Sequence, residues 1–156
     1  MNIVHSIVVR NSLKDTFSYL ESFKKNNPKI EVITSNTRFT LGTKYSEVFK
    51  WLGKTRKFRF EITQFIPNQT IKAITSSSDF PMEETLKVEH DEAGTRISWQ
   101  VNIQPKGLSK IISPVIKSNV SKQVSQQIHQ LKERLDLDFM TKTTLAFATQ
   151  NHNYWL

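Results

Sequence analysis

The sequence predicts one α+β domain in which a curved antiparallel sheet of about seven strands wraps a single long C-terminal helix. Short segments of alternating apolar and polar residues recur between residues 3 and 103, as expected of strands with one buried face. After residues 105–107, apolar residues recur every three or four positions, which is the spacing of an amphipathic helix. A series of strands followed by one long helix is the element order of an α+β fold. In α/β folds with a parallel sheet, strands and helices alternate instead.

The chain opens with a strand and a short helix. Residues 3–9 alternate and predict the strand. Ser12 then stands where a helix N-cap would, with Asp15 three residues later. The helix that follows should end before Pro28, because proline restricts the residue before it to extended conformations.

Six further strands are predicted, separated by turns that contain glycine, proline, asparagine, aspartate or serine. They cover residues 30–34, 43–52, 56–65, 70–75, 82–89 and 95–103. Short strands joined by tight turns favour an antiparallel meander.

The helix predicted over residues 108–135 needs a surface on which to bury its apolar stripe. The inward face of the sheet is the one surface large enough, and we expect an apolar pocket between the two. Pro114 predicts a kink or a separate first segment. We therefore divide the chain into a ligand-binding domain, residues 1–137, and a tail, residues 138–156, either disordered or packed on the body.

Composition limits the class of protein. The chain has no cysteine, and no apolar stretch approaches the roughly 20 residues that span a bilayer. The N-terminus lacks the pattern of a signal peptide, so a cytoplasmic protein is expected. The first sixty residues carry twelve Lys or Arg and four Asp or Glu, and so hold the whole net charge of +8. Such a field attracts anionic partners.

Several segments, in order, resemble one family. Residues 7–12 with 16–20 are similar to the opening strand and helix of the polyketide cyclase/dehydrase branch of the SRPBCC superfamily. That superfamily also contains the START lipid-transfer domains and the major birch pollen allergen. Further matching segments are residues 41–45, 52–54, 62–67, 94–99 and 105–108.

The resemblance covers about residues 3–137 and implies a helix-grip fold with a cavity between sheet and helix. It departs at Ser12, where the family usually has proline, and over residues 23–28. The number of short helices between the first two strands, one or two, therefore stays open. The resemblance does not imply a single reaction, because members bind lipids, steroids and polyketides and only some are enzymes.

Strand alternation places three polar side chains on the inward face: His5, Glu47 and Glu84. A buried carboxylate must be paired, solvated or protonated, so these residues either orient the polar end of a ligand or make structural pairs. His5 and Glu84 are the candidates for acid–base catalysis, although no catalytic residue is assigned. The predicted cavity residues are His5, Tyr45, Glu47, Phe49, Phe58, Phe60, Met82, Glu84, Trp99, Ile112, Ile116 and Val120. Val115 is expected on the same side of the helix.

Other kinds of site have little support in the sequence. The histidines show no metal-ligand spacing, so no metal site is expected, and no cofactor motif is present. A basic cluster at Lys50, Lys54, Arg56, Lys57 and Arg59 superficially suggests nucleic acid. Alternation sends Phe58 and Phe60 inward, where they cannot stack on bases. Anionic lipid headgroups, or carboxylates and phosphates of a ligand near the pocket mouth, are better partners for this charge.

Three functions remain open. The first is binding or carriage of a small hydrophobic or amphipathic molecule in the cavity. The second is a cyclase- or hydratase-type enzyme that uses His5 or Glu84 for proton transfer. The third is an interaction module that holds an acidic protein or an anionic membrane through the basic N-terminal half. The sequence does not give the oligomeric state.

Overall fold

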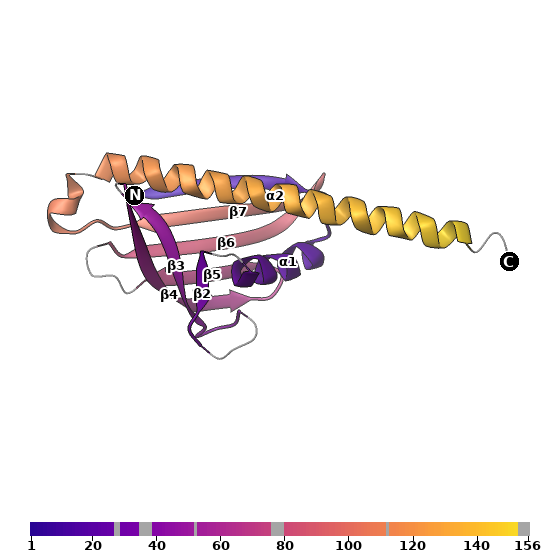
Figure 1. Ribbon diagram of the computed structural model, residues 1–156, viewed down its shortest axis with the longest axis horizontal. Coiled ribbons are helices and arrows are strands. Elements are labelled where there is room, and N and C mark those ends of the chain that lie inside the picture. Colours follow the sequence, from indigo (N-terminus) through magenta and orange to yellow (C-terminus); the bar gives the residue numbers. More distant parts are fainter. Residues whose placement is uncertain (27–28, 35–38, 52, 76–79, 112, 153–156) are drawn as a thin grey trace.

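The computed structural model describes residues 1–26, 29–34, 39–51, 53–75, 80–111 and 113–152. One sheet of seven strands holds two α-helices against its concave side (Figure 1). The strands are β1 (Asn2–Val9), β2 (Ile30–Val32), β3 (Lys44–Trp51), β4 (Lys54–Ile66), β5 (Thr70–Thr75), β6 (Met82–Asp91) and β7 (Gly94–Ile103). The helices are α1 (Leu13–Asn26), a short 3-10 turn η1 (Gly107–Lys110) and α2 (Ser113–His152). The predicted α+β fold is confirmed.

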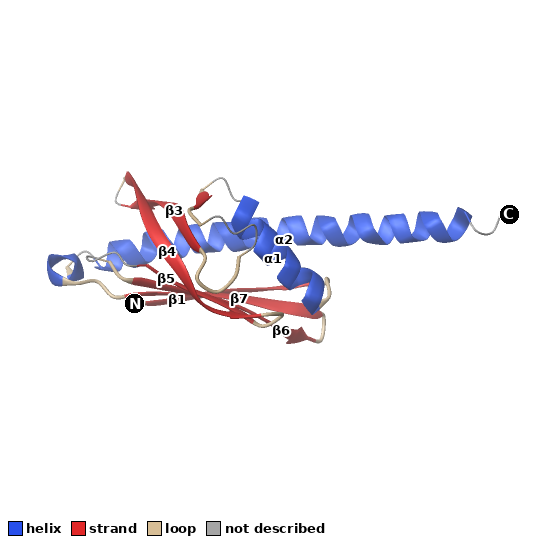
Figure 2. Cartoon of the chain, turned by 90° about the horizontal axis from the view of Figure 1, so that it is seen from below, coloured by secondary structure: helices blue, strands red, loops and turns tan. Residues whose placement is uncertain are grey.

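The strands lie in the order β1-β7-β6-β5-β4-β3-β2, and every neighbouring pair is antiparallel. Strands β3 to β7 form the predicted meander, while α1 separates β1 from β2 and lets β1 pair with β7 instead. The register of β4 against β5 shifts between Ile62 and Gln64, an irregularity of the kind that bends a sheet. In Figure 2, β3 and β4 curl upward beside α2.

Local sequence explains where both helices begin. The Ser12 hydroxyl accepts a hydrogen bond from the backbone N–H of Asp15 at 3.1 Å, which is the predicted N-cap of α1. Pro114 lies in the first turn of α2, where a missing N–H leaves no bond unmade. The segment before it forms the separate turn η1, one of the two arrangements that Pro114 predicted.

Helix α2 passes residue 137, where we had placed the domain boundary, and continues to His152. Its N-terminal part lies along the sheet, and its C-terminal part projects beyond both the sheet and α1 (Figure 1). The side chains that face the sheet are completely or almost completely buried: Ile116, Val120, Val124, Ile128, Leu131 and Leu135. Among the described residues, no helix combines the length and the apolar character that crossing a membrane requires.

Hydrogen bonds hold α2 at the two sides of the concave face. Lys132 Nζ donates to the backbone carbonyl of Val8 on β1 at 3.0 Å. At the other side, the Gln123 amide donates to the Lys50 carbonyl at 2.7 Å and accepts from the Lys50 N–H at 3.1 Å. Within the described part of the chain, the α2 backbone approaches β1 and β3 more closely than the middle strands β4 to β7. The helix therefore bridges the hollow of the sheet, with its buried stripe facing the floor.

Candidate functional site

Aromatic side chains from β3 and β4 form one wall of the interior. Tyr45 stacks on Phe60, with ring centroids 5.4 Å apart and an interplanar angle of 14°. Phe49 meets Phe58 edge to face at 5.7 Å, and all four rings are buried. Such a surface supplies a large apolar area with little side-chain freedom, as apolar ligand sites do.

A polar pair interrupts this apolar interior. Glu47 of β3 and Gln127 of α2 are both buried, and Gln127 Nε2 donates to Glu47 Oε1 at 3.4 Å. Gln127 Oε1 is also buried, and it has no hydrogen-bond partner among the described residues. A buried acceptor left without a donor costs about 1–3 kcal/mol. The interior therefore contains an acceptor suited to a donor from water or a ligand.

Glu84 lies in the middle of the sheet floor. It is buried on β6, opposite Ala73 of β5 and Val101 of β7 in the strand register. Its neighbours on the same face of β6, Met82 and Leu86, are buried as well. This second carboxylate is therefore inward-facing, as the alternation predicted, and it lies beside the small side chain of Ala73.

His5 lies at the edge of the sheet, away from Glu84. On β1 it is opposite Trp99, and its ring Nε2 lies 3.1 Å from the Ser121 hydroxyl of α2. Glu84 is two strands away across β7, a separation of roughly 10 Å at the usual strand spacing. His5 and Glu84 therefore cannot exchange a proton directly, and the visible contact of His5 is with the helix.

The remaining predicted cavity residues fall into three groups. Met82, Trp99, Ile116 and Val120 are buried. Ile112 lies outside the described residues. Val115 is exposed, contrary to its expected place on the inner side of the helix. The stripe through Ile116 and Val120 faces the sheet, and a residue one position before Ile116 is rotated by roughly 100° from it.

Gln127 and Ser121 belong to this interior, yet we did not select them from the sequence. Gln127 has a detectable signal, because it follows Val124 by three residues and so occupies a position on the apolar stripe. A polar residue at such a position is the helical counterpart of Glu47 or Glu84 on a strand. Ser121 lies at the margin of the stripe, where a serine is common.

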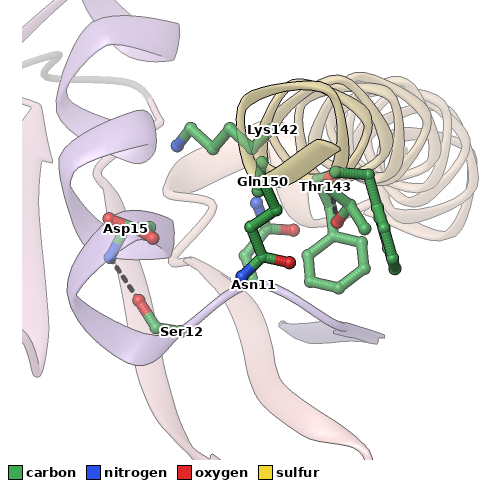
Figure 3. A pocket seen from close by; sticks show the side chains of 9 residues that line it. Asn11, Ser12, Asp15, Lys142, Thr143 and Gln150 are labelled. Carbon is green, nitrogen blue, oxygen red and sulfur yellow. Dashed lines mark hydrogen bonds between the residues drawn. The ribbon is translucent and has the colours of Figure 1, made fainter. Parts of the chain in front are cut away.

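Three pockets formed by described residues open at the surface, and none of the three lies between the sheet and α2. One, of about 430 Å³, lies where α1 begins beside the projecting part of α2 (Figure 3). Asn11, Ser12 and Asp15 face Lys142 and Gln150 across it. The other two, of about 530 and 410 Å³, are lined largely by outward-facing side chains of the sheet. Ten of the predicted cavity residues are buried, while His5 is partly exposed and Ile112 lies outside the described residues.

The basic cluster lies on the β3–β4 hairpin. Lys54, Arg56, Lys57 and Arg59 are exposed, whereas Phe58 and Phe60 are buried, as the alternation predicted. Lys57 pairs with Glu31, and the hydrogen bond and charge of Lys57 lower the pKa of that carboxyl. The described residues contain no group of three or more His, Asp or Glu that could hold a metal ion.

Comparisons with known proteins identify the fold. No protein-family model matches the chain, and no curated protein matches it in sequence. Among solved structures it is similar to a START superfamily protein from Mycobacterium smegmatis, with a TM-score of 0.65, 13% identity, and 87% of this chain and 97% of that chain covered. A protein from Thermus thermophilus gives a TM-score of 0.70 and 15% identity, with 86% of this chain and 97% of that chain covered.

The Aha1 dimer from Colwellia psychrerythraea gives a TM-score of 0.61, with 16% identity and 87% and 96% of the two chains covered. At these identities the likeness shows a shared fold and nothing finer. The fold that the resemblance implied is therefore confirmed. The chain has the helix-grip fold of a START superfamily protein.

Proposed function

We propose that this protein binds or carries a small apolar or amphipathic molecule between the middle strands of the sheet and α2. Proteins use this fold in several ways, so the fold by itself supports only a ligand between sheet and helix. The single observation that carries the proposal is the buried Glu47–Gln127 pair with its unsatisfied acceptor, Gln127 Oε1.

The chemistry of the interior restricts the ligand. Tyr45, Phe49, Phe58 and Phe60 offer an apolar wall, which suits a hydrocarbon or ring system. Gln127 Oε1 accepts but cannot donate, so the ligand should carry a hydroxyl or amine at that end. The ligand is thus an apolar body with one hydrogen-bond donor.

Because the residues that would contact the ligand are buried, we expect binding to require movement of α2 or a neighbouring loop. Helix α2 is held mainly at its two sides, through Lys132 at β1 and Gln123 at β3. Movement of the helix away from the floor would therefore break few polar contacts. A ligand that fills the space would compensate through apolar burial, about 25 cal/mol per Å².

Native mass spectrometry of freshly purified protein, followed by extraction of bound lipophiles, tests the proposal directly. A bound apolar molecule with a donor group is expected, and readdition to stripped protein should raise Tm. Gln127→Leu should weaken that binding about tenfold, corresponding to about 1.4 kcal/mol. Gln126→Leu, on the exposed side of the same helix, is the matched control and should leave affinity unchanged.

Absence of any bound molecule, together with no rise in Tm across a panel of apolar alcohols and amines, would contradict the proposal. Equal losses from the two glutamine variants would contradict the role of Gln127. Carriage and catalysis separate on the recovered ligand, since a carrier returns its ligand unchanged.

A further inference from the structure

The outer face of α2 changes character at residue 137. Upstream, the solvent side of the helix is polar, with Lys122, Gln126, Gln130 and Glu133 exposed. Downstream, the same side carries Leu137, Met140, Thr144 and Phe147, all exposed. At 3.6 residues per turn, these four lie opposite the stripe that α2 buries against the sheet. We call them the outer seam.

The outer seam has the spacing of a helix-pairing surface. Its residues follow one another by three, four and three positions, as the a and d positions of a coiled coil do. Leu137, Met140 and Phe147 are each more than half exposed. A helix that stays in water on all sides would be expected to carry charges there, as the upstream part of α2 does.

The projecting segment leaves the body in a defined direction. Asn11 Nδ2 donates to Asp138 Oδ2 at 3.3 Å, and the Arg10 guanidinium lies 5.0 Å from the ring centroid of Phe139. These contacts hold the side of α2 that faces α1. Leu137, Met140 and Thr144, on the other side, are therefore presented outward, and Phe147 borders the pocket beside α1 while staying 64% exposed.

The charge of the projecting segment distinguishes between a membrane and a second protein chain as the partner of the outer seam. Residues 137–150 contain one anion and one cation, Asp138 and Lys142, and these pair with each other at 3.0 Å. The segment is thus neutral, whereas the whole chain carries +8. A helix that lies on a membrane surface typically has a polar face rich in Lys and Arg, which this segment lacks. A second neutral, apolar seam fits it better.

We infer that the outer seam pairs with the same seam of a second copy of this chain, in antiparallel orientation about a two-fold axis. In antiparallel pairing, a and d positions meet, which places Leu137 beside the partner's Phe147 and Met140 beside the partner's Thr144. All four seam residues are then covered on both chains.

Antiparallel pairing also keeps the positively charged globular parts of the two chains apart. The ten residue steps from Leu137 to Phe147 span about 15 Å of helix. This length exceeds the roughly 8 Å over which salt screens charges at physiological ionic strength. Parallel pairing would instead bring two +8 bodies side by side and align Glu133 and Gln130 with their counterparts. The seam is short, so the interface falls below the roughly 1,200 Å² of stable complexes, and the dimer should be concentration-dependent.

Analytical ultracentrifugation of the full chain over a range of concentrations tests this pairing. A monomer–dimer equilibrium is expected, and Met140→Glu or Phe147→Glu should raise its Kd by about tenfold or more, because each buries a charge at the interface. Leu145→Glu is the matched control: Leu145 is 62% exposed and Phe147 64%, but Leu145 points about 120° away from the seam. Far-UV circular dichroism checks that each variant keeps its helix content.

Orientation can be read by disulfide trapping, since the chain has no cysteine of its own. Leu137→Cys mixed with Phe147→Cys should form a mixed disulfide, and neither variant should link to itself. A strictly monomeric chain, a dimer that responds equally to Leu145→Glu, or self-linked Leu137→Cys would overturn the inference. Monomeric protein that sediments with anionic vesicles would overturn it in favour of a membrane.

Discussion

Gln127 and Glu47 are 80 residues apart in the chain and meet in its interior, where the Gln127 amide donates to the Glu47 carboxylate at 3.4 Å. The contact joins α2 to β3, one of the two strands between which the helix bridges the sheet. Both side chains are buried, and Glu47 lies opposite Phe58 in the register of β3 and β4.

Burial along α2 ends abruptly after Leu135, so that Leu131 is fully buried whereas Leu137 is 65% exposed. We expect Leu131→Ala to lower the free energy of unfolding by about 2–5 kcal/mol, because it leaves a cavity against the sheet. Leu137→Ala, the same change on the same helix, should stay within about 0.5 kcal/mol. Urea unfolding of dilute protein measures both, and similar losses would show that the helix does not dock through this stripe.

The turn between β6 and β7 requires glycine at position 94. Gly94 has φ +139°, and a Cβ there would lie 2.1 Å from the Val9 carbonyl oxygen. Gly53 also has a positive φ, +75°, but no atom lies within 4 Å of its Cβ position. Gly53→Ala should therefore cost about 1–2 kcal/mol from backbone strain alone, and Gly94→Ala should cost more. Thermal unfolding would contradict this account if the two variants were equally stable.

Asp91 should make stability depend on acid. The Ala93 backbone N–H, which donates to Asp91 Oδ1 at 3.1 Å, and then Arg96 lower the pKa of this carboxyl. A carboxyl whose pKa falls on folding stabilises fully above its ordinary value of 3.8, and this contribution is lost as the pH falls through the lowered pKa. Asp91→Asn should thus be less stable than wild type at neutral pH, and the difference should vanish in strong acid.

Urea unfolding at a series of pH values measures that difference. Because the largest cause is a backbone hydrogen bond, most of the difference should persist in high salt, which screens Arg96. A difference that stays constant across the acid range would show that the Asp91 carboxylate is not responsible.

The contact between His5 and Ser121 should be measurable as a coupling energy. A double-mutant cycle with His5→Leu and Ser121→Ala is expected to give about 0.5–1.5 kcal/mol, the usual net contribution of one hydrogen bond. The same cycle with Ser118→Ala, an exposed serine earlier on α2, should give a value near zero. Equal couplings would mean that His5 is not tied to the helix through Ser121.

The fold could be predicted largely because its signals are local. Alternation assigned Glu47 and Glu84 to the inner face, and both are buried, since a strand's side chains change face at every residue. The prediction for α2 was wrong at Val115, which is exposed, because one position along a helix is already a rotation of about 100°. Gln127 could have been found as a polar residue on that stripe, whereas the partner of its amide depends on where α2 crosses β3.

The sequence by itself determined which residues face inward, where the helices start and that one long helix must cover a curved sheet, because periodicity, capping and turn chemistry act over a few residues. Only the tertiary structure decided which polar groups meet and that α2 runs on past the sheet to expose the outer seam. These outcomes depend on distances between segments far apart in the chain, and no pattern within one segment contains that information.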